Sequence, residues 1–136
     1  MRRLLILVPM LALAAACDER LDATFGVTPR ASELVFTVQP SNVQAGAAIT
    51  PAVQVTVRNT LGQTVTTSDT TVTITIAPGT GTSGAVLIGP LPSTRAVSGV
   101  ATFNNLRISL AGTGYRLTAN VEGIPLATSN LFDVAP

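Results

Sequence analysis

The sequence lacks histidine, lysine and tryptophan altogether, and it contains one cysteine in 136 residues. Histidine, lysine and cysteine are the side chains that most often act as general bases or activated nucleophiles. A serine without such a base is an ordinary surface or turn residue. A single cysteine forms no disulfide within the chain, so stability must come from an apolar core. Without tryptophan, an exposed aromatic platform for sugars is hard to build. We therefore expect a protein that is not an enzyme and that needs no cofactor.

Charged residues are also scarce, at 11% of the chain. Removing a leader that contains Arg2 and Arg3 would leave six of the eight basic residues against seven acidic ones, a formal charge of −1. This balance gives no basic face for nucleic acid. Asp69, Glu122 and Asp133 are the carboxylates of the expected domain, and no D-x-D run accompanies them. We interpret them as solvated surface groups, and we expect no metal site.

The N-terminus has the three parts of a secretory signal. Two arginines follow Met1, thirteen mostly apolar residues run from Leu4 to Ala16, and the run ends on three alanines directly before Cys17. Thirteen helical residues cover about 20 Å, less than the roughly 30 Å of a bilayer core, which favours cleavage over a spanning helix. The segment resembles a bacterial lipoprotein signal. The resemblance implies that residues 1–16 are removed and that Cys17 is lipidated as the first mature residue.

Cys17 also has a simpler interpretation. Lipoprotein signals prefer leucine where Ala14 stands, and the three alanines equally fit an ordinary signal peptidase site, which would leave Cys17 as a free thiol. A lone thiol in an oxidising compartment invites pairing between chains, which favours lipidation. Asp18 is an inner-membrane retention signal in enterobacterial lipoproteins, a rule that varies between bacteria, so the choice of membrane stays open. Residues 17–33 would then form the lipidated cysteine and a flexible tether with a reach of roughly 20 Å.

From Leu34 onward, apolar and polar residues alternate with the period of a half-buried strand. Threonine and valine are abundant, and branched side chains of this kind pack well on a pleated sheet. Seven or eight short strands separated by turn residues predict an all-β fold, a two-sheet antiparallel sandwich. The expected strands lie at about 34–39, 53–58, 71–76, 85–88, 95–97 with 100–103, 106–110, 115–122 and 126–134.

The segments between these strands are rich in turn residues. They include Ala45-Gly46, Asn59–Gly62, Pro78–Gly84 and Ser98-Gly99. Ser98-Gly99 predicts a tight hairpin. The glycines at 79–84 lack the Lys-Ser/Thr pair and the helix of a phosphate loop, so we predict a flexible loop there. Phe103 is out of phase with Leu106, Ile108 and Leu110, and a bulge at Asn104-Asn105 would absorb the extra residue.

Residues 112–119, Gly-Thr-Gly-Tyr-Arg-Leu-Thr-Ala, resemble the G-x-x-Y-x-L-T-A run of bacterial immunoglobulin-like domains, the invasin and intimin-like modules of cell surfaces. The likeness extends over most of the chain from Leu34 to Val134. Its other matches are Gln39-Pro40, Ala45-Gly46, the strand Val53–Val57, Leu61-Gly62 and Gly99–Phe103. The resemblance implies an immunoglobulin-like β-sandwich at 34–136. It also implies that Tyr115 is a structural tyrosine corner, with its hydroxyl bonded to backbone and its ring packed inward.

The resemblance further implies a surface-exposed module without catalytic activity. We expect a cell-envelope lipoprotein with a single such module in an adhesive, structural or display role, attached to a membrane through Cys17 and meeting a protein or glycan at the cell surface. The alternative is an exported accessory module that binds a ligand or glycan. Modules of this kind usually occur in tandem, so the chain either works alone or belongs to a longer protein. A glycan site needs an exposed aromatic ring, so burial of Tyr115 and Phe103 would favour the first interpretation. Ligand-binding residues and oligomeric state stay open.

Overall fold

The computed structural model describes residues 30–89 and 93–136, and every regular element in these ranges is a β-strand. This confirms the predicted all-β class. The strands are β1 (Glu33–Val38), β2 (Val43–Gln44), β3 (Val53–Arg58), β4 (Thr71–Ile76), β5 (Leu87–Ile88), β6 (Ser93–Arg95), β7 (Val100–Phe103), β8 (Arg107–Ile108), β9 (Gly112–Tyr115), β10 (Leu117–Val121), β11 (Ile124–Thr128) and β12 (Phe132–Ala135).

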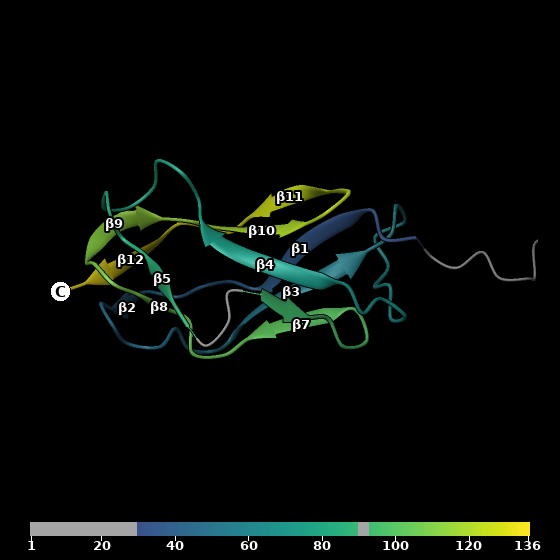
Figure 1. Cartoon of the computed structure of the whole chain (residues 1–136), viewed down its shortest axis with the longest axis horizontal. Coiled ribbons are helices and arrows are strands. Elements are labelled where there is room, and N and C mark those ends of the chain that lie inside the picture. Colours follow the sequence, from purple (N-terminus) through teal and green to yellow (C-terminus); the bar gives the residue numbers. More distant parts are fainter. Residues whose placement is uncertain (1–29, 90–92) are drawn as a thin grey trace, which may run out of the picture.

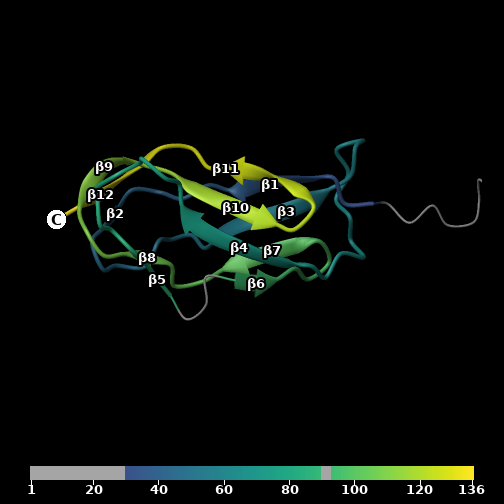
Figure 2. The same ribbon diagram turned by 45° about the horizontal axis from the view of Figure 1, so that its top comes forward.

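Two sheets form the layers of an immunoglobulin-like sandwich (Figure 1). One has the strand order β1-β3-β7, and the other has the order β11-β10-β4-β6, which Figure 2 shows from a second angle. Two smaller sheets, β2-β12-β9 and β5-β8, extend the fold at one end. All pairings are antiparallel except that of β12 with β2.

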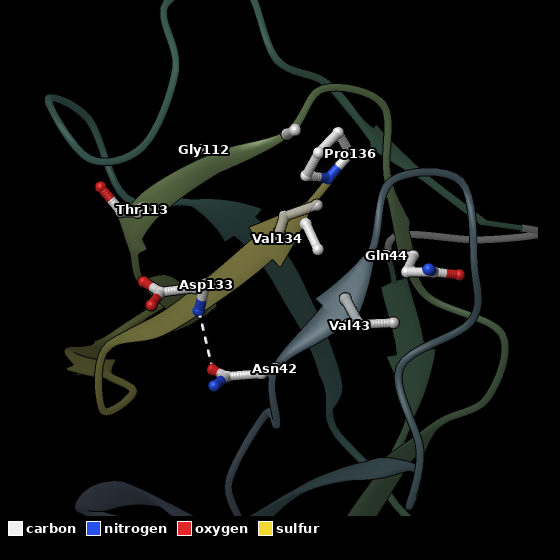
Figure 3. Close-up of a pocket in the computed structure, with 10 residues that line it drawn as sticks. Asn42, Val43, Gln44, Gly112, Thr113, Asp133, Val134 and Pro136 are labelled. Carbon is white, nitrogen blue, oxygen red and sulfur yellow. Dashed lines mark hydrogen bonds between the residues drawn. The ribbon is translucent and has the colours of Figure 1, made fainter.

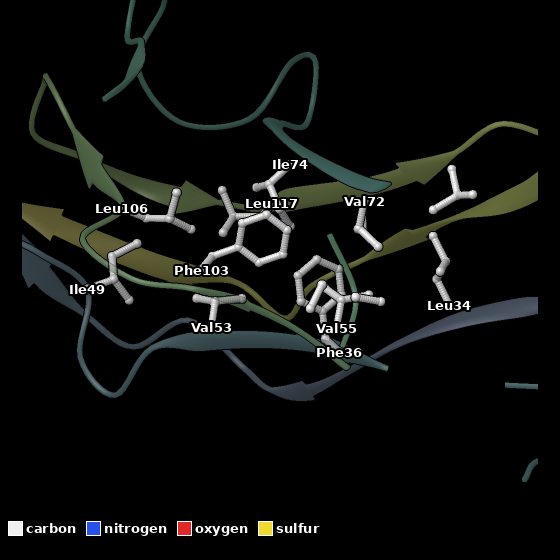
Figure 4. Close-up of a cluster of buried hydrophobic side chains, with 14 of the residues drawn as sticks. Leu34, Phe36, Ile49, Val53, Val55, Val72, Ile74, Phe103, Leu106 and Leu117 are labelled. Carbon is white, nitrogen blue, oxygen red and sulfur yellow. The ribbon is translucent and has the colours of Figure 1, made fainter. Parts of the chain in front are cut away.

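The core lies between the layers, and the alternation of the sequence supplies it. Val53, Val55 and Val57 are fully buried on β3, and Leu117 and Ala119 are fully buried on β10. Figure 4 shows apolar side chains of both layers meeting in this space. Removing this much aliphatic surface from water is the main source of stability for a fold that has no disulfide to rely on.

Both C-terminal strands of the prediction are broken in the structure. The segment expected at 115–122 is divided at Arg116 into β9 and β10, and the one expected at 126–134 is divided into β11 and β12. Buried Ser129 fixes the second break, because its hydroxyl accepts a hydrogen bond from the amide of Leu117 (2.8 Å) and donates one to the carbonyl of Asn130 (2.9 Å). At this break the chain passes from the sheet β11-β10-β4-β6 to the sheet β2-β12-β9. The structure therefore has two strands where the sequence predicted one.

Two predicted connections differ in detail. Asn104-Asn105 is a turn and not a bulge, with Asn105 at a φ of 61°, because β7 pairs with β3 whereas β8 pairs with β5 in another sheet. Ser98 and Gly99 do form a tight turn, at φ 52° and 83°. Only the bridge between Val97 and Val100 closes it, since β6 and β7 then diverge into opposite layers.

The alternation also fails at one residue after the turn at Asn105. Leu106 and Ile108 are buried as expected, but Leu110 is 41% exposed. Strand β8 ends at Ile108, so Leu110 lies in the connection to β9 and no longer follows the period of a strand.

The expected boundary at residue 34 lies a few residues too late. Glu33 belongs to β1, and the amide of Ser32 donates to the carbonyl of Arg58 at 2.8 Å. Ala31 packs against the core. The last residues assigned to the tether are therefore part of the sandwich. The single charge of Glu33, opposite Arg58 on β3, is compatible with an exposed strand position.

Candidate binding groove

The signal segment 1–16, the lipidation site expected at Cys17 and the tether residues up to 29 lie outside the residues that the structure describes. Within residues 30–89 and 93–136, no helix is long and apolar enough to cross a membrane.

Tyr115 is the best-defined of the residues singled out from the sequence. It lies at the end of β9, is fully buried, and its hydroxyl donates a hydrogen bond to the carbonyl of Leu110 at 2.8 Å. Its ring packs against Phe132, with the centroids 5.9 Å apart. This backbone contact a few residues upstream is the one that characterises a tyrosine corner.

Phe103 is 2% exposed and lies in the same core as Tyr115. Neither ring is therefore available to stack on a sugar. The burial of both rings that was expected from the sequence is confirmed, and a glycan site built on either ring is excluded.

The glycine-rich segment 78–84 closes over Tyr115, whereas the sequence predicted a flexible loop. A Cβ atom added at Gly81 would lie 2.1 Å from the tyrosine ring, so only glycine fits there. The hydroxyl of Thr80 donates to the carbonyl of Ala77 (2.7 Å), and that of Thr82 donates to the carbonyl of Ala111 (2.6 Å). The first bond closes the loop on itself, and the second holds it against the residue that precedes β9.

The three carboxylates that the sequence assigned to the domain lie in separate surroundings. Asp69 forms an exposed ion pair with Arg95 at 2.6 Å. Asp133 Oδ1 accepts a hydrogen bond from the amide of Gly114 at 2.9 Å, and Glu122 lies in the exposed turn between β10 and β11. Within the described residues, no group of three potential metal ligands is found.

An open groove of about 640 Å³ lies over the small sheet β2-β12-β9 (Figure 3). This volume is within the range of small-molecule sites in proteins. Several lining residues are alanine or glycine, and their small side chains leave the hollow. The lining consists of Asn42, Val43, Gln44, Ala111, Gly112, Thr113, Asp133, Val134, Ala135 and Pro136.

The lining of this groove includes polar side chains from each of the three strands. Asn42 Oδ1 accepts a hydrogen bond from the amide of Asp133 at 2.9 Å, which ties β2 to β12. The carboxylate of Asp133 is held in turn by Gly114 of β9. With Gln44 and Thr113, the rim offers amide, hydroxyl and carboxylate groups that can hydrogen-bond to peptide groups or to sugar hydroxyls.

Sequence reasoning missed this groove, because its residues come from segments far apart in the chain. The relevant signal was the run Gly112-Thr113-Gly114, which served only as a family motif. Small residues on a strand often mark a close approach of another group. The parallel pairing of β2 with β12 brings these segments together around the groove. No local sequence pattern predicts that pairing.

The groove and the start of the domain lie at opposite ends of the sandwich. Strand β1 begins at Glu33, which pairs with Arg58 at the end of β3. Strand β3 starts nearer the groove, at Val53, and runs toward this pair. Figure 1 shows the start of β1 at one end of the long axis, and β2, β9 and β12 with the C-terminal residue at the other. We call these the proximal end, near Arg30 and Arg58, and the distal end, which carries the groove.

No known protein family matches the chain, and no curated protein is similar to it in sequence. Among solved structures it is similar to a glycosyl hydrolase family 2 member from Bacteroides cellulosilyticus, with a TM-score of 0.59 and 12% identity over 79% of this chain and 14% of that one. A β-glycosidase from Bacteroides vulgatus gives a TM-score of 0.59 and 13% identity over 77% and 14% of the two chains.

A β-glucuronidase from Parabacteroides merdae is also similar, with a TM-score of 0.51 and 21% identity over 76% of this chain and 12% of that one. The chain thus spans only a small part of each of these enzymes. At such low identity the likeness shows the fold alone, an immunoglobulin-like β-sandwich, since one fold hosts many activities. No invasin or intimin relative is among these similar structures.

Proposed function

We propose that the protein is a non-catalytic module of the cell envelope, anchored by lipid at Cys17, that acts through contacts at its distal end. The observation that carries this proposal is the arrangement of the two ends. The chain enters the sandwich at the proximal end, and the groove lies at the distal end. A module held by its N-terminus would present the groove away from the membrane, where an adhesive, structural or display role is exercised.

The non-catalytic part of the proposal rests on composition and on the use of the polar groups. Histidine and lysine are absent from the sequence. Asp69 is paired with Arg95, and Asp133 bonds to Gly114 at the other end of the domain. Each carboxylate thus has its own partner, and neither is paired with the other as an acid and a base would be.

An accessory module that binds glycans is the second candidate, and the groove is what favours it. The rim carries the amides of Asn42 and Gln44, the hydroxyl of Thr113 and the carboxylate of Asp133. Such groups bind vicinal hydroxyls, although no exposed aromatic ring accompanies them. The similar structures are glycosidases, which is in keeping with a sugar-related setting. Burial of Tyr115 and Phe103 ranks this candidate second.

Lipid attachment is tested by metabolic labelling with a palmitate analogue in a bacterium that processes lipoproteins. We expect the wild-type protein to be labelled and the Cys17→Ser variant to stay unlabelled, because the variant removes the thiol that accepts the lipid. Recovery of both proteins outside the cytoplasm is the control for export. Equal labelling of the two proteins, or none of either, would contradict the proposed anchor.

The distal contact is tested by filling the groove. Ala135→Arg adds a long charged side chain to an exposed lining residue, so binding of the mature, non-lipidated Cys17→Ser protein to an envelope fraction should fall at least tenfold. Thr128→Arg is the matched control, since it adds the same side chain to an exposed residue of β11 outside the groove. Loss of binding after protease treatment of the fraction indicates a protein partner, whereas loss after periodate indicates a glycan. Unchanged binding by the Ala135→Arg variant would refute the groove as the contact surface.

A further inference from the structure

The most exposed large apolar side chains in the described part of the molecule are Leu61, at 78%, and Val97, at 74%. Both project from loops at the proximal end. Leu61 lies in the turn that follows β3, and Val97 lies in the turn that precedes β7. Single exposed apolar residues are common on protein surfaces, so their shared location is the feature that needs an explanation.

Backbone hydrogen bonds hold the two loops against the same end of β3. The amide of Val57 donates to the carbonyl of Gly99 (2.8 Å), and the amide of Val65 donates to the carbonyl of Val57 (2.9 Å). The amide of Gly99 also donates to the carbonyl of Ser68 at 3.3 Å. The loop that contains Leu61 and the turn that contains Val97 therefore form one surface.

Each apolar tip is also fixed locally. The side-chain oxygen of Asn59 accepts hydrogen bonds from the amides of Leu61 (2.9 Å) and Gln63 (3.0 Å). Val97 and Val100 exchange backbone hydrogen bonds at 2.9 and 3.0 Å. Leu61 and Val97 are therefore exposed in ordered turns. Exposing apolar side chains to water costs free energy, and contact with an apolar partner would remove that cost.

Charge at the proximal end favours no particular ionic partner. Three basic and three acidic residues lie there, and one pair of them is joined in the ion pair of Asp69 with Arg95. The six are Arg30, Glu33, Arg58, Asp69, Arg95 and Glu122. Because these charges balance, apolar contact by Leu61 and Val97 is the interaction that this end offers to a lipid surface.

We propose that the proximal end rests on a lipid surface, with Leu61 and Val97 inserted at the headgroup level. This inference rests on the proposed anchor at Cys17. Twelve residues separate Cys17 from Arg30. The flexible tether expected from the sequence has a reach of roughly 20 Å, so the anchor would hold the proximal end within reach of the membrane.

The test uses the mature chain with Cys17→Ser, joined through an N-terminal hexahistidine tag to phosphatidylethanolamine and phosphatidylglycerol vesicles that contain a nickel-chelating lipid. The substitution leaves Leu61→Cys as the sole thiol for an environment-sensitive dye. The matched control is Leu131→Cys, a leucine with a comparable exposure of 58% that lies next to β12, away from the proximal end.

We expect the dye at residue 61 to shift to shorter wavelength when vesicles are added, and the dye at residue 131 to keep its emission. No shift at residue 61, or equal shifts at both positions, would overturn the inference. Because the tag replaces the lipid, this result is independent of whether Cys17 is lipidated. The palmitate labelling described above tests that anchor separately.

Discussion

At the scale of single residues, Tyr115 contacts three separate segments of the distal half. The alternation of apolar and polar residues in the sequence indicates only that its side chain is buried. Its hydroxyl bonds to Leu110, its ring packs on Phe132, and the segment around Gly81 lies directly on the ring. The resemblance to immunoglobulin-like domains implied the first of these contacts. The third was not foreseen, because the contact joins residues that are 34 positions apart.

The core assignment is tested at Leu117, which is fully buried on β10. Leu117→Asp should abolish cooperative folding, since an unpaired buried carboxylate costs several kcal/mol against a total stability of about 5–15 kcal/mol. Asn120→Asp is the control, because it introduces the same group at an exposed position of the same strand. Thermal unfolding followed by circular dichroism is the measurement. A Leu117→Asp protein that melts cooperatively near the wild-type temperature would show that the face assignment is wrong.

At the scale of elements, the segment 78–84 is a packed cover of the tyrosine corner. Gly79 and Gly81 both have positive φ, at 78° and 67°, so an alanine is strained at either position. They differ in what surrounds them. A Cβ at Gly79 meets nothing within 4 Å, whereas a Cβ at Gly81 overlaps the buried ring of Tyr115.

This pair of glycines separates backbone strain from packing. Gly79→Ala should lower the free energy of unfolding by about 1 kcal/mol, from backbone strain alone. Gly81→Ala should lower it by roughly 2–4 kcal/mol, because overlap with a packed ring adds to that strain. Urea unfolding of both variants measures the difference. Equal losses would mean that the loop does not pack on Tyr115.

The alternation of the sequence predicted the main core-facing residues of β1, β3 and β4. It did not predict where strands break, because a break such as that at Ser129 depends on a hydrogen bond to Leu117 in a neighbouring strand. The turn at Asn105 was missed for a similar reason. A bulge and a change of sheet leave the same phase shift in the sequence, and only pairing with β5 distinguishes them.

At the scale of the whole molecule, the two ends of the sandwich differ in their surfaces. The proximal end has two ordered apolar tips, at Leu61 and Val97, and strand β1 begins there. The distal end has a groove with polar groups from three strands. Because Tyr115 and Phe103 are buried, a partner at the groove would contact amide groups, hydroxyl groups and one carboxylate. We therefore expect the two ends to contact different materials.

Photo-crosslinking in intact cells shows what each end of the sandwich contacts. A benzophenone amino acid is introduced at exposed Leu61 in one protein and at exposed Thr113 in another, each with the natural Cys17. We predict lipid adducts from residue 61 and adducts with a protein or glycan from residue 113. Lipid adducts from residue 113, or identical adducts from both positions, would contradict this prediction.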